Sequence, residues 1–193
     1  MLKQRLISAL ILSIGIVSAL FLLPTNYLII FILLLTCVSL LEFLSLRFST
    51  LTTILIVCFS LVLFYFSSFP GLNKIFIGFS ALIYIGLFFL IISFPVSKPF
   101  LQRNFIWLTS GVAIHLGFFA SLYFLISQDE LVLKHFGTDI TNRATLLIIV
   151  LISVMMDSFA FFGGKRFGKS KLLPNVSPNK TIEGFLISMT ITP

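Results

Sequence analysis

Charged residues are scarce in this chain, and their scarcity excludes a soluble globular protein. Asp, Glu, Lys and Arg together make up 10% of the 193 residues, whereas hydrophobic residues make up 59% and the mean hydropathy is +1.17. A soluble domain carries about 25% charged residues. With so little charge, the chain cannot cover its own surface with polar groups. The composition therefore predicts an integral membrane protein.

Cysteine is almost absent, and acidic residues are few. Cys37 and Cys58 lie in apolar segments without partners at metal-ligand spacing, so we predict neither a disulfide nor a metal site for them. Lys and Arg outnumber Asp and Glu by 13 to 6. This excess reflects the uneven distribution of basic residues between the loops, together with one strongly basic loop. Because it shows no nucleic-acid-binding pattern, we predict no nucleic-acid partner.

Long apolar runs dominate what is present. A helix that spans a membrane needs about 20 mostly apolar residues. Six segments qualify, at roughly 6–23, 27–46, 50–69, 75–94, 105–127 and 144–163, and an incomplete seventh runs over 182–193. They lack two-residue alternation, and an open sheet cannot span lipid. We predict an all-α, polytopic integral membrane protein with six spanning helices and the start of a seventh, in a single transmembrane domain over 1–193.

Basic residues are distributed unevenly between alternate loops. With the N-terminus in the cytoplasm, that side holds ten Lys and Arg residues, five of them in the loop 164–181, against three on the other side. The positive-inside rule therefore places the N-terminus and this basic loop in the cytoplasm. The outer connection 128–143 carries mixed charges and is expected to be a solvated loop.

Three ionisable residues fall within the apolar segments. An ionised Asp at the centre of a spanning helix costs about 2.5–3.5 kcal/mol, so Asp157 is expected to face a polar cavity and to be functional. The alternative is that Asp157 has a structural role and is bonded to neighbouring helices. Glu42 is expected to reach the interface or to pair with a basic residue. His115 is expected to bond to a neighbouring helix as a neutral imidazole.

The residues from Gly163 to Ser170 match the nucleotide-binding pattern G-x-x-x-x-G-K-[ST]. A true P-loop follows a strand and opens a helix, whereas here a predicted spanning helix precedes the motif. We therefore predict no P-loop fold. The residue types still suit an anion, because glycines allow close backbone approach and lysines neutralise phosphate.

The segment from Asp157 to Phe185 carries the pattern D-S-x-A-[YF]-x-x-G-K-x-F-G-K-x-K-L-x-P-x-[VI]-S-P-x-K-T-x-[EQ]-G-F. This pattern resembles that of the bacterial phosphatidate cytidylyltransferase (CDP-diacylglycerol synthase) family. The chain departs from it at Phe159, where the family usually has glycine. The family's later acidic signature, H-G-G-x-x-D-R-x-D, is not among these 193 residues. The resemblance thus covers about the first two-thirds of a family member, and we expect the C-terminal third to be lacking.

The resemblance implies transfer of CMP from CTP to phosphatidate, which gives CDP-diacylglycerol and pyrophosphate in phospholipid biosynthesis, with Mg²⁺ as cofactor. It implies catalytic roles for Asp157, Lys180 and Glu183, with Asp157 also a metal ligand. The implied substrate-binding residues are Ser158, Lys165, Gly168, Lys169, Lys171, Ser177, Pro178 and Thr181. The expected partners are CTP, phosphatidate and membrane lipid in the bacterial inner membrane, and a homodimer is left open.

Two alternatives remain open from the sequence. A catalytically inactive remnant or membrane scaffold of this family would explain the missing acidic signature and Phe159. An anionic-lipid transporter or lipid-binding protein would use the basic loop without any dependence on CTP.

Overall fold

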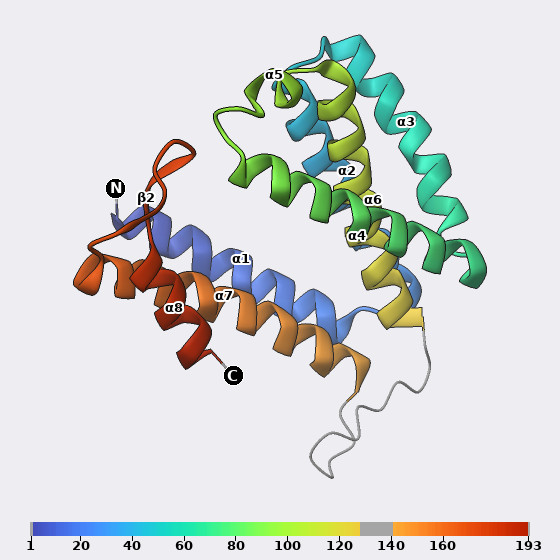
Figure 1. The fold of residues 1–193 in the computed structure, drawn as a ribbon. Coiled ribbons are helices and arrows are strands. Elements are labelled where there is room, and N and C mark those ends of the chain that lie inside the picture. The colour runs from blue at the N-terminus through green and yellow to red at the C-terminus, as the bar shows by residue number, and fades with distance from the viewer. Residues whose placement is uncertain (1, 128–140, 193) are drawn as a thin grey trace. The chain divides into compact units, whose positions relative to one another are not determined.

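A computed structural model describes residues 2–127 and 141–192, with the side chains of residues 2–10 and 12 left out (Figure 1). The predicted outer loop 128–143 therefore lies almost entirely outside the described residues. The chain forms two compact units. One comprises Met1–Ile77 with His115–Leu147, and the other comprises Gly78–Ile114 with Ile148–Pro193.

The described residues form helices joined by short connections, together with one small hairpin. The elements in chain order are α1 (Leu2–Leu22), α2 (Thr25–Ser45), α3 (Thr50–Phe66), α4 (Pro70–Ile92), α5 (Lys98–Leu101), α6 (Asn104–Ser127), α7 (Asn142–Phe167), β1 (Lys171–Leu173), β2 (Ser177–Thr181) and α8 (Ile182–Ile191).

Polar and proline residues set the helix starts. Pro24 precedes α2, and Pro70 opens α4 at the first helical position, where its missing N–H costs nothing. The Ser49 hydroxyl caps α3 by accepting from the Thr52 N–H at 3.4 Å. These breaks divide the apolar sequence into separate helices, as the sequence predicts.

Four described helices are long and apolar enough to cross a membrane: α2, α4, α6 and α7. The predicted polytopic, helical membrane protein is thus confirmed in outline. Two further expected spans, 6–23 and 50–69, overlap α1 and α3, and the incomplete seventh, 182–193, overlaps α8. Of these helices, α3 has only 17 residues and α8 only 10. The count of six spans stays a prediction. Along α4, Leu82, Phe88 and Phe89 are each at least 60% exposed, which suits a lipid-facing surface.

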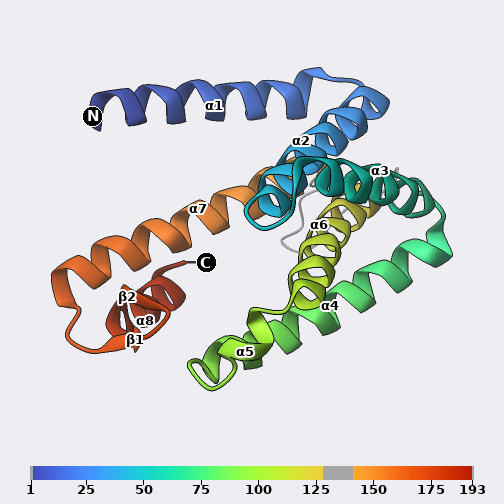
Figure 2. The same ribbon diagram turned by 90° about the horizontal axis from the view of Figure 1, so that it is seen from above.

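In the first unit, apolar contacts join sequence-distant helices. Leu20, Leu28, Ile126 and Leu146 form a buried cluster, and the rings of Phe64 and Phe119 lie with centroids 5.2 Å apart. Figure 2 shows α2 and α3 joined by the short turn that lets them pack together. This core contains Ile126 and Leu146, which lie before and after residues 128–140 in the sequence.

Buried and partly buried polar side chains bridge helices of the same unit. The Asn73 amide donates to the carbonyls of Ser67 at 2.8 Å and Ala120 at 3.0 Å. His115 Nε2 lies 3.1 Å from Ser39 Oγ, which confirms that His115 bonds to a neighbouring helix. Arg143 Nη1 donates to the Leu20 carbonyl at 3.1 Å, near the end of α1. Such bonds satisfy polar groups that lipid cannot.

In the second unit, the predicted loop 164–181 has more structure than expected. Helix α7 continues through residue 167, and the residues after it fold into the antiparallel hairpin β1–β2 before α8 begins (Figure 1). The sequence analysis did not predict this hairpin. Its strands, Lys-Leu-Leu and Ser-Pro-Asn-Lys-Thr, are short and carry no alternating apolar pattern that would indicate a sheet.

Candidate active site

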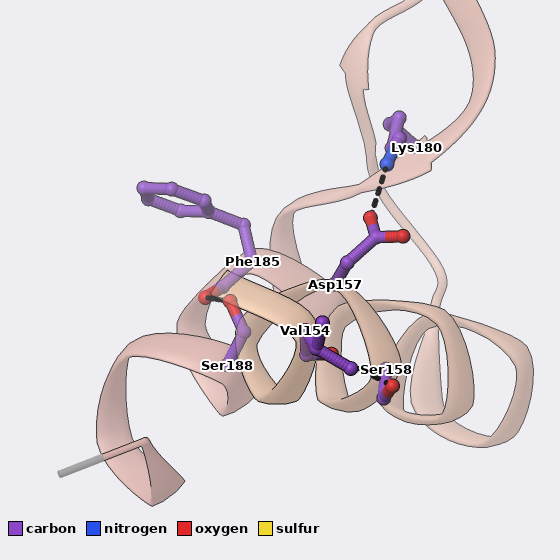
Figure 3. Close-up of polar contacts among 6 residues, drawn as sticks. All are labelled: Val154, Asp157, Ser158, Lys180, Phe185 and Ser188. Carbon is purple, nitrogen blue, oxygen red and sulfur yellow. Dashed lines mark hydrogen bonds and ion pairs between the residues drawn. The ribbon is translucent and has the colours of Figure 1, made fainter. Parts of the chain in front are cut away.

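The predicted site residues occupy one continuous segment of the second unit. Asp157 lies on α7, ten residues before the helix ends at Phe167. Its side chain is 82% exposed and points to the hairpin, where Lys180 Nζ lies 3.5 Å from Asp157 Oδ1 (Figure 3). One residue along, the Ser158 hydroxyl donates to the Val154 carbonyl at 2.8 Å, within its own helix.

A tight turn between the strands sets the position of Lys180. The Val176 N–H donates to the Leu173 carbonyl at 3.1 Å, which closes a β-turn with Pro174 and Asn175 at its centre. Proline favours the first central position of such a turn because its φ is fixed. The register pairs Lys171 with Thr181 and Leu173 with Ser177. Lys180 therefore lies on β2, the strand that returns toward Asp157.

Pro178 lies inside β2, where a proline would break a larger sheet. The described sheet has only two strands, so each strand has a free edge that tolerates the missing N–H. Ser177 is partly buried at the start of the same strand.

Glycines bring α7 and α8 into close contact. A Cβ on Gly184 would lie 2.5 Å from the Ala160 carbonyl oxygen and 2.9 Å from the Gly164 backbone. A Cβ on Gly168 would lie 2.3 Å from the Gly164 carbonyl oxygen and 2.7 Å from Thr181 Cγ2. Both positions therefore require glycine, since real Cβ atoms do not approach so closely. Gly168 serves this packing, and no ligand contact by it is needed to explain the residue.

Thr181 joins the hairpin to α8. As the N-cap residue it accepts a hydrogen bond from the Gly184 N–H at 3.2 Å. Its side chain also fills the space next to Gly164 and Gly168. The predicted substrate-binding residue Thr181 is thus a packing and capping residue in this structure.

The Glu183 carboxylate bonds to the loop between α7 and β1. The Lys169 N–H donates to Oε2 at 3.1 Å, and the Ser170 N–H donates to Oε1 at 3.1 Å and to Oε2 at 3.2 Å. The pKa of Glu183 is lowered, first by its own backbone N–H and then by that of Lys169, because both stabilise the charged form. The sequence does not predict this role of Glu183, because the donors are backbone N–H groups, which every residue except proline has.

The structure also shows whether residues 163–170, which match the P-loop pattern, form a P-loop. Gly163 to Phe167 are helical and belong to α7, so no strand precedes the motif. The N–H groups of Lys169 and Ser170, which a P-loop would turn to phosphate, face Glu183 instead. The prediction that no P-loop fold occurs is confirmed.

The structure brings some predicted residues together and leaves others apart. Asp157 meets Lys180, and Glu183 meets the backbone of Lys169. The remaining loop lysines, Lys165 and Lys171, are exposed to solvent. Glu42 is an exposed residue of α2 in the first unit. Among residues 2–127 and 141–192, no three His, Cys, Asp or Glu side chains form a cluster that could hold a metal ion.

Comparison with known proteins assigns the chain to a family. The profile of the cytidylyltransferase family matches residues 3–192. The chain belongs to the cytidylyltransferase family. The match covers nearly all of the sequence, including the helices that precede Asp157.

The relatives share the name phosphatidate cytidylyltransferase. The chain is 36% identical to that of Haemophilus influenzae over 98 residues, which are 50% of this chain and 32% of the relative. It is 51% identical to that of Aquifex aeolicus over 41 residues, 21% of this chain and 16% of the relative. It is 66% identical to that of Bacillus subtilis over 29 residues, 15% and 11% of the two chains. The matched segments span a third or less of these relatives, and no solved structure matches.

Proposed function

We propose that the protein is a phosphatidate cytidylyltransferase, which transfers CMP from CTP to phosphatidate, and that Asp157–Glu183 forms part of its substrate site. The observation that carries this proposal is the pairing of Asp157 with Lys180 at 3.5 Å, beside exposed lysines, in a membrane protein of the cytidylyltransferase family. The bacterial inner membrane is the proposed location, with the N-terminus and the hairpin on the cytoplasmic side, where CTP is available.

The proposed reaction exchanges one phosphorus–oxygen bond for another. A phosphate oxygen of phosphatidate attacks the α-phosphorus of CTP. The bond from the α-phosphorus to the oxygen that bridges it to the β-phosphate breaks, and its electron pair leaves with pyrophosphate. Such transfers need positioning and charge neutralisation from the protein more than covalent chemistry.

The lysines supply that neutralisation in this proposal. An ion pair between exposed side chains stabilises by only about 0–1 kcal/mol, and Lys180 is 58% exposed. Lys180 can therefore leave Asp157 and bind a substrate phosphate at little cost. Lys165, Lys169 and Lys171 are exposed and can reach other phosphate groups. Ser158 and Ser177 are partly exposed and would add hydrogen bonds.

Asp157 fits the role of a Mg²⁺ ligand. Proteins hold Mg²⁺ at phosphate-transfer sites through one or two carboxylates, and the substrate phosphates complete the coordination. An 82% exposed carboxylate meets that need, whereas the Glu183 oxygens accept backbone hydrogen bonds. The bound ion would stabilise negative charge on the phosphate oxygens. Asp157 itself would hold the ion near Lys180.

The test is the formation of CDP-diacylglycerol from CTP by this chain in lipid–detergent micelles with phosphatidate and Mg²⁺. The proposal predicts a product that requires all three additions. Phosphatidate binding without any CTP-dependent product would favour the lipid-binding alternative. No product from these 193 residues, nor from a longer chain that contains them, would favour the inactive scaffold and overturn the proposal.

A further inference from the structure

The carboxylate of Glu183 holds both ends of the hairpin together. On one side it accepts the Lys169 and Ser170 N–H groups, and close by the Ile182 N–H donates to the Ser170 carbonyl at 3.0 Å. The loop that leaves α7 is thus bonded to the first turn of α8. Because a hydrogen bond to a charged acceptor is stronger than one between neutral groups, the carboxylate is a main element of this junction.

The junction determines where Lys180 lies. Residues 171 and 181 are paired in the hairpin, so both strands leave the junction at the same level. Lys180 is the neighbour of Thr181 in β2 and contacts Asp157 on α7. A shift of Lys169 and Ser170 away from Glu183 would therefore move the strand that carries Lys180.

We propose that Glu183 is a positioning residue, whose carboxylate fixes the loop 168–170 on α8 and so places Lys180 opposite Asp157, and that it binds neither metal nor phosphate. This inference rests on the proposed function for its catalytic consequence. It replaces the expectation that Glu183 acts beside Asp157 in the reaction. In effect the carboxylate takes the place that a phosphate would occupy in a nucleotide-binding loop.

Glutamine and alanine separate a positioning role from a metal-binding one. Glu183 Oε2 accepts from both Lys169 and Ser170, so the single amide oxygen of Glu183→Gln can retain these contacts without the charge. Glu183→Ala retains none of them. A metal ligand would tolerate neither change.

The first measurement needs no turnover. Hydrogen exchange at the Lys169 and Ser170 amides is followed in micelles for the full chain, with Thr190→Ala on the exposed face of α8 as the control. We expect exchange about tenfold faster in Glu183→Ala and a smaller change in Glu183→Gln, as the loss of bonds to a charged group implies. Unchanged exchange in Glu183→Ala would overturn the proposal, whether or not the protein is an enzyme.

The second measurement concerns the metal. Binding of Mn²⁺ in the presence of CTP is followed by electron paramagnetic resonance, a readout that does not depend on turnover. We expect Glu183→Gln to bind Mn²⁺ as the unsubstituted protein does and to keep turnover within about tenfold of it, the effect of roughly one weakened hydrogen bond. Loss of Mn²⁺ binding in Glu183→Gln would assign the carboxylate to the metal and overturn the proposal.

Discussion

Asp157 is the acid on which the proposed chemistry depends most. We expect Asp157→Asn to lower CDP-diacylglycerol formation by at least about 100-fold, since it removes a charged ligand from the phosphate site. Membrane insertion should be unaffected because the side chain is exposed. The assay compares this variant with Ser153→Ala, an exposed position one turn earlier on α7. Turnover of Asp157→Asn at the level of this control would remove Asp157 from the mechanism.

Glu183 gives the loop a defined pH dependence. Its pKa is lowered in the folded chain, chiefly by its own N–H and by that of Lys169. A carboxyl group of this kind stabilises the folded state above its unfolded pKa of about 4.3, and the contribution is lost as the pH falls through the lower folded value. We expect the amide proton shifts of Lys169 and Ser170 to titrate below about pH 4.3. Titration above that pH would contradict the contact.

The packing of α7 against α8 depends on glycine. We expect Gly184→Ala to destabilise the protein by about 1–3 kcal/mol, because its Cβ would overlap the Ala160 carbonyl oxygen and the Gly164 backbone. Thermal unfolding in detergent would measure the loss. Gly86→Ala in α4 is the matched control, since nothing lies within 4 Å of its Cβ. Equal stability of the two variants would mean that the helices do not cross as closely as described.

How far the sequence predicts these elements depends on the signal each carries. The apolar runs and the prolines predict the helices, and α8 begins at Ile182 as expected. Asp157 and Lys180 are brought together from positions 23 residues apart, as their shared assignment to one site requires. The hairpin escapes prediction because its turn, Pro174–Asn175, is its only local signal. The contacts of Glu183 also cannot be predicted from the sequence, because their donors are backbone N–H groups.

Across the whole molecule, the proposal requires the hairpin to face the cytoplasm. A cysteine introduced as Asn175→Cys, with Cys37 and Cys58 replaced by alanine, should resist a membrane-impermeant maleimide in intact cells and react after lysis. A cysteine at Asn26, in the first turn of α2, should react in intact cells. The reverse pattern would place the lysines on the side without CTP and contradict the topology.

The fate of the CTP phosphates tests the central claim most directly. CTP labelled at the α-phosphate or at the γ-phosphate is incubated with the protein, phosphatidate and Mg²⁺, and the lipid is extracted. Transfer of CMP predicts that the α-label enters the lipid and that the γ-label appears in pyrophosphate. A γ-label in the lipid, or no label there under any condition, would contradict the assignment of this protein as a cytidylyltransferase acting on phosphatidate.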